Sequence, residues 1–266
     1  MRLDELRPLP PPATLAEKPG LKVAVAAILS PLGTISSYQK LMTHLERLTG
    51  APVTLVQRKT YQETNDLLAR GVVDVGFVCT GAYLEGARQG GMSLLVVPQI
   101  GGATTYRSLL IVPAASSAQG LADLRGKIFA FTDPLSNSGY LYPLSLLREK
   151  GEQPEGFFAR TIFTYSHDRS LAAVAEGVAA GAAVDSLVYE FTKARNPELA
   201  DQVRVIWQSP EFGIPPVVVP SSAPAERREW LRRLFLGLHR DEEGRQALEA
   251  LGVERFVEAD PRRYVQ

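Results

Sequence analysis

The sequence is poor in the residues that build covalent or metal-bound frameworks. Its 266 residues include a single cysteine, Cys79, which excludes a disulfide within the chain and a cysteine-rich metal site. No apolar stretch approaches the roughly 20 residues that a membrane-spanning helix needs. The 29 basic and 29 acidic residues balance, and without a basic surplus nucleic acid and anionic membranes are poor partners. Any anion site must therefore be local.

Short motifs of the common catalytic and cofactor sites are also missing. The sequence contains no Walker loop, GxGxxG, HExxH, CxxC or GxSxG motif. A triad of Ser138, His167 and Asp185 can be written down, but no nucleophile-elbow motif supports it. We therefore expect no enzyme activity, no catalytic residues, no cofactor and no bound metal.

The first 20 residues are rich in proline and of mixed charge, and they lack the apolar segment of a secretory signal. We expect residues 1–20 to form an extended arm. Two locations stay open: outside the cytoplasm, if an export signal was removed from the chain, or in the cytoplasm.

Apolar strands and amphipathic helices alternate from Lys22 onward. Apolar residues keep helical spacing over 35–48 up to Gly50, and Thr60 with Glu63 forms the signature of a capping box. Such alternation is typical of an α/β fold with mostly parallel sheets flanked by helices. Within the helix at 35–48, His44 lies on the polar face, and we expect a solvated side chain there.

Two interruptions divide this alternation. The stretch 101–105 and the proline-bracketed stretch 209–216 are interpreted as crossings between two lobes. This predicts a first lobe formed by residues 21–105 and 211–266, and a second formed by residues 106–210. We expect a hinge near Thr105 and Pro210.

The segment from Asp133 to Pro143 is the part of the chain that best predicts a binding site. It joins an apolar run, Ile128 to Phe131, to a helical pattern that ends near Gly151. Serines and a glycine at a helix N-terminus leave main-chain N–H groups free to bind an anion. Helix capping by Asp133, Ser136 or Ser138 is the simpler alternative, but two hydroxyls and a glycine exceed what one cap requires.

Other polar loops follow the carboxyl ends of predicted strands, where open α/β sheets bind ligands. Together with the central segment they span residues 30–37, 80–83, 136–140, 166–168 and 185–186, and none contains lysine or arginine. Neutral donors and helix ends would then hold an oxyanion. Asp185 could accept a hydrogen bond from a ligand that keeps a P–OH or carries an ammonium group, or it could cap the next helix. His167 could donate to the ligand or support its loop.

Several of these segments together resemble the PhnD-like family of phosphate-, phosphite- and phosphonate-binding proteins of ABC transporters. The similar segments are Gly71 to Phe77, Thr80 to Tyr83, Tyr106 to Ser108, Leu121 to Lys127, Asp133 to Tyr140, Ser166 to Asp168, Ala183 to Ser186, and Phe256 with Val257. The resemblance covers nearly the whole chain from Lys22 and implies a type II periplasmic-binding-protein fold, in which two α/β lobes close on a ligand.

The resemblance also implies which residues bind the ligand. Ser136, Asn137, Ser138 and Gly139 would hold a phosphorus oxyanion, Tyr106, His167 and Asp185 would complete the pocket, and Tyr38 and Tyr83 would lie nearby. Thr80 and Tyr140 join the candidate set from their loops. The family usually has Ser-Thr-Ser-Gly where this chain has Ser-Asn-Ser-Gly, so ligand selectivity can differ although asparagine still offers N–H donors. The segment Thr80 to Tyr83 stands where the family typically has a Gly-Pro pair before the tyrosine.

The function expected from the sequence is that of a monomeric solute-binding protein. It would capture a phosphonate, phosphite or phosphate between its lobes and deliver it to the membrane subunits of an ABC importer. Three alternatives remain: an enzyme of the same fold, a cytosolic sensor of another small anion, and a ferric-ion binder, although the adjacent tyrosine pair usual in iron binders of this shape is absent.

Overall fold

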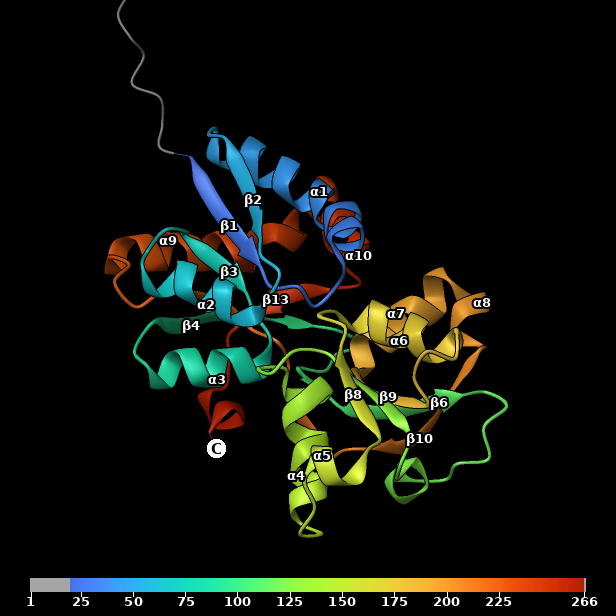
Figure 1. Cartoon of the computed structure of the whole chain (residues 1–266). Helices are drawn as coiled ribbons and strands as arrows, with labels where there is room; N and C mark the ends of the chain where they lie inside the picture. Colours follow the sequence, from blue (N-terminus) through green and yellow to red (C-terminus); the bar gives the residue numbers. More distant parts are fainter. Residues whose placement is uncertain (1–19, 266) are drawn as a thin grey trace, which may run out of the picture.

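The computed structural model describes residues 20–265, so the expected N-terminal arm lies outside the described residues except for Gly20. Two lobes stand side by side, each a β-sheet covered by helices on both faces (Figure 1). Among the described helices, none combines the length and apolarity that crossing a membrane would require.

The first lobe is built on a six-stranded sheet with the order β13-β4-β12-β3-β1-β2. Its strands are β1 (Leu21–Val25), β2 (Val53–Gln57), β3 (Val75–Phe77), β4 (Met92–Gln99), β12 (Val217–Pro220) and β13 (Arg255–Val257). The helices of this lobe are α1 (Pro31–Thr49), α2 (Tyr61–Ala69), α3 (Thr80–Arg88), α9 (Ala225–Gly237), η4 (Leu238–Arg240) and α10 (Glu242–Ala250). The chain ends with the short helix η5 (Pro261–Tyr264).

The second lobe has a five-stranded sheet with the order β10-β6-β9-β7-β8. Its strands are β6 (Ser108–Pro113), β7 (Ile128–Phe131), β8 (Arg160–Phe163), β9 (Gly181–Asp185) and β10 (Val203–Gln208). The helices of this lobe are η2 (Leu121–Leu124), η3 (Asn137–Leu141), α4 (Tyr142–Arg148), α5 (Pro154–Phe157), α6 (His167–Ala175), α7 (Ser186–Arg195) and α8 (Pro197–Ala200).

Both sheets follow the same plan, in which one inverted strand is inserted among parallel strands, and in the first lobe the edge strand β13 is also antiparallel to its neighbour β4. In the first lobe, β12 is antiparallel to its neighbours β3 and β4, whereas β1 is parallel to β2 and β3. In the second lobe, β6 is antiparallel to β9 and β10, whereas β7 is parallel to β8 and β9. The prediction of mostly parallel sheets is thus confirmed for the strands that lead into the polar loops.

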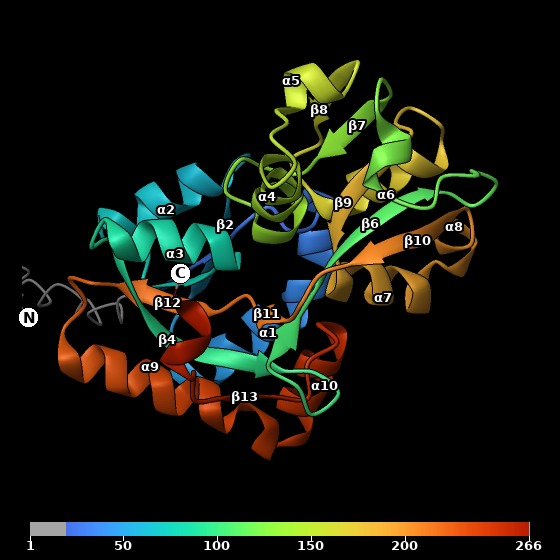
Figure 2. The same cartoon turned by 90° about the horizontal axis from the view of Figure 1, so that it is seen from below.

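Each inverted strand follows a crossing between the lobes. The crossings pair with one another as a two-stranded antiparallel sheet of β5 (Thr105–Tyr106) and β11 (Phe212–Gly213), which lies between the two larger sheets (Figure 2). Within residues 20–265, the chain passes from one large sheet to the other through these two short strands and their flanking residues, which form a narrow link between the lobes.

Local signals in the sequence explain why the first helices begin and end where they do. The Ser30 hydroxyl accepts a hydrogen bond from the N–H of Gly33 at the start of α1, and Gly50 ends that helix with a left-handed φ of 61°. Glycine is the residue that adopts this conformation at least cost. The predicted capping box of Thr60 and Glu63 is present at the start of α2.

One local prediction was wrong. His44 was expected in solvent, yet only 2% of its surface is exposed, because Asp241 and Glu243 at the start of α10 place carboxylate oxygens 3.5 and 3.6 Å from its ring nitrogens. These carboxylates come almost 200 residues later in the chain, so the local pattern around His44 could not reveal them.

Candidate functional site

The central feature of the site is the turn that connects β7 to η3. The Ser136 hydroxyl accepts a hydrogen bond from the N–H of Gly139, with Oγ and N 3.0 Å apart, and thereby caps the helix. Gly139 is required because a Cβ at this position would overlap the side chain of Thr132. The helix continues directly from η3 into α4. Capping, the simpler interpretation of this segment, therefore accounts for Ser136.

Capping does not account for Ser138. Its side chain is fully buried, and its Oγ has no hydrogen-bond partner among residues 20–265. The carbonyl oxygen of the same residue accepts a hydrogen bond from the hydroxyl of Ser108, with the two oxygens 2.6 Å apart. A buried polar group without a partner costs about 1–3 kcal/mol. The turn thus holds one hydroxyl whose hydrogen bonds remain to be made.

His167 supports this turn from the first residue of α6. The main-chain N–H of Asp185 donates to its Nδ1 at 3.1 Å, so the neutral ring carries its proton on Nε2, which lies 3.4 Å from the Ser136 hydroxyl. Burial lowers the pKa of His167 to about 3, which keeps the ring neutral. Because Ser136 Oγ already accepts from His167 and Gly139, its own proton is free to point toward a ligand.

Asp185 both caps a helix and faces the space between the lobes. Its carboxylate accepts a hydrogen bond from the N–H of Leu187, 2.7 Å away, at the start of α7. It also lines an interlobe cavity, and burial raises the pKa of this carboxyl to about 7. The two interpretations of Asp185 are therefore compatible, and near neutral pH a substantial share of the carboxyl groups retains a proton.

Tyr106 connects the crossing strand β5 to the turn. The side-chain amide of Asn137 donates to its hydroxyl at 3.2 Å. On the other crossing strand, the carbonyl oxygen of Gly213 accepts a hydrogen bond from the Thr80 hydroxyl at 2.8 Å. The structure thus brings together seven of the predicted site residues: Thr80, Tyr106, Ser136, Asn137, Ser138, Gly139 and His167.

The other tyrosines of the predicted set lie apart from this cluster. Tyr38 packs edge-on against Phe77 and lines the interlobe cavity, Tyr83 packs against Tyr264 of η5, and Tyr140 packs against Phe131 and Phe163. Tyr140 therefore belongs to the hydrophobic core of the second lobe in this conformation.

The two lobes are closed against each other around the cluster. The N–H of His167 donates to the carbonyl oxygen of Ile28 at 3.0 Å, and the N–H of Ser30 donates to the carboxylate of Asp168 at 3.0 and 3.1 Å. Gly81, in the first turn of α3, approaches the turn so closely that a Cβ would overlap the carbonyl oxygen of Leu135. Polar loops of both lobes therefore meet at one place.

Some residues of the site were not predicted from the sequence. Ser108 holds the Ser138 carbonyl, and the N–H of Tyr61 donates to the carboxylate of Asp133 across the lobes at 3.1 Å. The Cys79 thiol is buried, and burial raises its pKa to about 11, although main-chain N–H groups of Asn137 and Gly81 act in the opposite direction. Only the position of Cys79 directly before the Thr80 loop hinted at this placement.

The arrangement does not match a serine-hydrolase site. His167 contacts Asp185 through the main-chain N–H and not through the carboxylate, so the imidazole–carboxylate hydrogen bond that a triad requires is not formed. Within residues 20–265, no group of three or more histidine, cysteine, aspartate or glutamate side chains is placed to hold a metal ion. The site offers neutral hydrogen-bond donors instead.

Two α/β lobes whose sheets share the order of five strands, joined by paired crossings and closed over a polar cluster, define the type II periplasmic-binding-protein fold, as predicted. The binding-protein component of an ABC phosphonate transporter from Pseudomonas aeruginosa superimposes with a TM-score of 0.87, at 24% identity, over 93% of this chain and 84% of that protein. PhnD1 from Prochlorococcus marinus, solved with methylphosphonate, gives a TM-score of 0.81 at 19% identity, over 92% and 94% of the two chains.

The family is shown by sequence. Residues 23–264 match the family model described as "ABC transporter, phosphonate, periplasmic substrate-binding protein", and the chain belongs to this family. The phosphate-import protein PhnD of Mycolicibacterium smegmatis is 34% identical over 185 residues, which cover 65% of this chain and 58% of that protein. The matches span about half the length of the curated relatives.

Proposed function

We propose that the protein captures a small phosphorus oxyanion, such as a phosphonate, phosphite or phosphate, between its lobes. The buried, unpartnered hydroxyl of Ser138 is the observation that carries this proposal. Together with the free proton of Ser136 and the N-terminus of η3, it would supply hydrogen-bond donors to the ligand without a cationic side chain. The Mycolicibacterium relative is named for phosphate import and the Prochlorococcus structure contains methylphosphonate, which supports this ligand class.

The energetics are compatible with such a site. Micromolar affinity corresponds to about 8 kcal/mol, and a hydrogen bond to a charged partner contributes about 1.5–3 kcal/mol. Five or six donors therefore suffice after ordering costs are subtracted. A buried Asp185 that retains its proton would donate to a ligand oxygen, whereas its ionised form would repel a dianion.

The biological role proposed here is delivery of the ligand to the membrane subunits of an ABC importer, by a monomer in the periplasm or at the cell surface. Members of this family are periplasmic substrate-binding proteins. The paired strands β5 and β11 would serve as the hinge between a first lobe of residues 21–105 and 211–266 and a second of residues 106–210. An enzyme of this fold is the alternative, and a search for chemical change of the bound ligand would identify it.

Calorimetry with phosphate, phosphite, methylphosphonate and 2-aminoethylphosphonate tests the proposal. We expect at least one of them to bind, and we expect Ser138→Ala to weaken that binding about tenfold or more because one charge-assisted donor is lost. Ser117→Ala, at an exposed position of the second lobe, is the control and should leave the affinity unchanged. Equal affinities for the wild type and Ser138→Ala would remove Ser138 from the site.

A further inference from the structure

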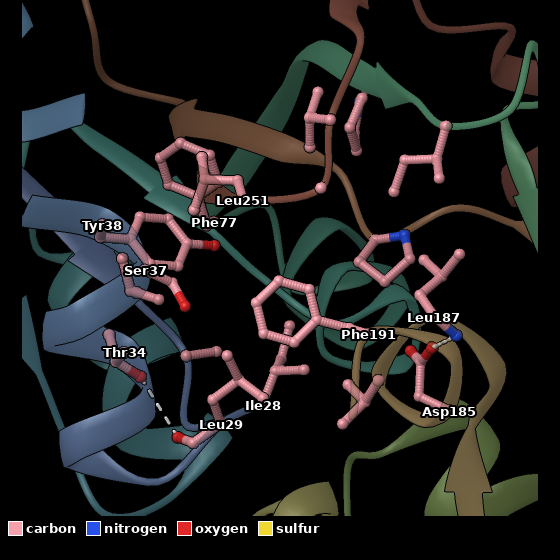
Figure 3. Close-up of a pocket in the computed structure, with 18 of the residues that line it drawn as sticks. Ile28, Leu29, Thr34, Ser37, Tyr38, Phe77, Asp185, Leu187, Phe191 and Leu251 are labelled. Atoms are coloured by element: carbon pink, nitrogen blue, oxygen red, sulfur yellow. Dashed lines mark hydrogen bonds between the residues drawn. The ribbon is translucent and has the colours of Figure 1, made fainter. Parts of the chain in front are cut away.

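A cavity of about 410 Å³ lies between the lobes, bounded by α1, the crossings and α7. Figure 3 shows Ile28, Leu29, Phe77, Leu187, Phe191 and Leu251 among the residues that line it. An apolar cavity of about 150 Å³ is sufficient to bind benzene. This chamber can therefore hold more than a tetrahedral anion, and its walls are hydrocarbon.

The few polar groups of the cavity stand at opposite ends. Tyr38 and Ser37 direct their hydroxyls inward from α1, and Asp185 lies on the far side (Figure 3). Ser37 Oγ is buried and has no hydrogen-bond partner within the described part of the chain. No lysine or arginine of residues 20–265 lines the cavity, whereas Glu190 stands at its exposed rim. An anionic group would find no counter-charge here.

Asp185 is shared by this cavity and the cluster around Ser136. Its carboxyl group lines the cavity, while its main-chain N–H binds His167, whose Nε2 faces the Ser136 hydroxyl. A ligand that occupied both the Ser136 turn and the chamber would therefore lie against Asp185.

We propose that this chamber binds an uncharged, largely apolar organic substituent of about the size of a phenyl or benzyl group, attached to the phosphorus oxyanion. The inference rests on the proposed function and refines its ligand class from small phosphonates to phosphonates with a hydrophobic substituent. Burial of a ring of this size removes enough apolar surface from water to raise affinity about 10- to 100-fold over a methyl group. The raised pKa of Asp185, which burial causes, agrees with uncharged and apolar surroundings of its carboxyl group.

Calorimetry with methyl-, propyl-, 2-aminoethyl- and benzylphosphonate tests the inference on the wild-type protein. We expect benzylphosphonate to bind at least tenfold more tightly than methylphosphonate, and propylphosphonate more tightly than 2-aminoethylphosphonate. Benzylphosphonate that binds no more tightly than methylphosphonate, or a preference for the aminoethyl compound, overturns the inference and leaves the proposed function standing. If no phosphorus oxyanion binds, the proposed function fails and the inference fails with it.

A filled cavity gives an independent test. Leu187→Trp places a bulky ring inside the chamber and should abolish the advantage of benzylphosphonate while methylphosphonate affinity changes less than threefold. Lys193→Trp adds the same ring to α7 at an exposed position that does not line the cavity, and it should behave as the wild type. Equal loss of both ligands in Leu187→Trp, with thermal unfolding unchanged, would contradict the inference.

Discussion

The main-chain N–H of Asp185 donates a hydrogen bond to Nδ1 of His167, with the two nitrogens 3.1 Å apart. This bond joins the end of β9 to the start of α6 and fixes the proton of the neutral ring on Nε2, which faces Ser136. The imidazole ring of His167 therefore connects Asp185 to the turn at Ser136. The proton on Nε2 can be observed directly.

His167 should stay neutral, with its proton on Nε2, from pH 8 down to about pH 5. Burial lowers the pKa of this ring to about 3, so the charged form is disfavoured throughout this range. Nitrogen-15 chemical shifts of the two ring nitrogens report both protonation and tautomer. A titration of His167 near pH 6.5, the ordinary value for histidine, would show that the ring is accessible to water.

Asp185→Asn should stabilise the protein at high pH. Because burial raises the pKa of Asp185 to about 7, the folded state holds this proton more tightly than the unfolded state. The free energy of unfolding therefore falls as pH rises from about 4 to about 7 and is level above that. Asparagine keeps an acceptor for the Leu187 N–H and does not ionise. Above pH 7 the free energy of unfolding of the variant should therefore exceed that of the wild type by about 4 kcal/mol at most.

Urea unfolding of both proteins at pH 4, 6 and 8 measures this effect. The difference in unfolding free energy should be small at pH 4 and largest at pH 8, and comparison of the two proteins cancels other titrating groups. A difference that does not change with pH would mean that Asp185 is ionised in the folded protein.

Ligand affinity should fall in the wild type as pH rises through about 7, because the ionised Asp185 repels an oxyanion. Phosphate and phosphonates also titrate near this pH, so the comparison with Asp185→Asn, measured by calorimetry on the same ligand, isolates the protein's contribution. The variant should lose less affinity than the wild type between pH 6 and pH 8. Parallel curves for the two proteins would exclude Asp185 from contact with the anion.

Gly81→Ala should prevent full closure of the lobes. A Cβ at Gly81 would overlap the carbonyl oxygen of Leu135, which belongs to the other lobe. Alanine favours helices over glycine, so the first turn of α3 itself should not suffer. We expect a larger radius of gyration in small-angle X-ray scattering with ligand, and an affinity reduced about tenfold or more.

Gly156→Ala is the matched control for this substitution, because a Cβ there would have no atom within 4 Å. It should leave both scattering and affinity unchanged. A Gly81→Ala protein that closes normally around its ligand would show that the described contact between the lobes does not belong to the bound state.

The alternation of elements and the turn at Ser136 could be predicted from sequence because their signals are local. The capping box at Thr60, the glycine after α1 and the hydroxyls before η3 are each contained in a few consecutive residues. The same locality explains the wrong expectation for His44, whose neighbours come from α10.

The division of the predicted site into a polar cluster and a hydrocarbon chamber could not be predicted in this way. Tyr38 and Asp185 line the chamber because α1 and the start of α7 border the same interlobe cavity, and this arrangement leaves no periodic pattern in the sequence. Likewise, the carbonyl oxygen of Ser138 accepts a hydrogen bond from Ser108, which precedes it by 30 residues and is the first residue of β6. From its position in the sequence Tyr140 was placed in a polar loop, but its ring packs against Phe131 of the core.

Tyr106 belongs to the narrow link between the lobes, and its hydroxyl also receives the Asn137 amide from the turn at Ser136. Tyr106 therefore takes part both in the pairing of the crossing strands and in the contacts of the turn at Ser136. Tyr106 and Asn137 both belong to the second lobe, so this contact can persist when the lobes separate. If the crossing strands form the hinge and the turn at Ser136 holds the ligand, as proposed, Tyr106 would connect the two, and the residence time of the ligand would depend on the hinge as well as on the binding turn.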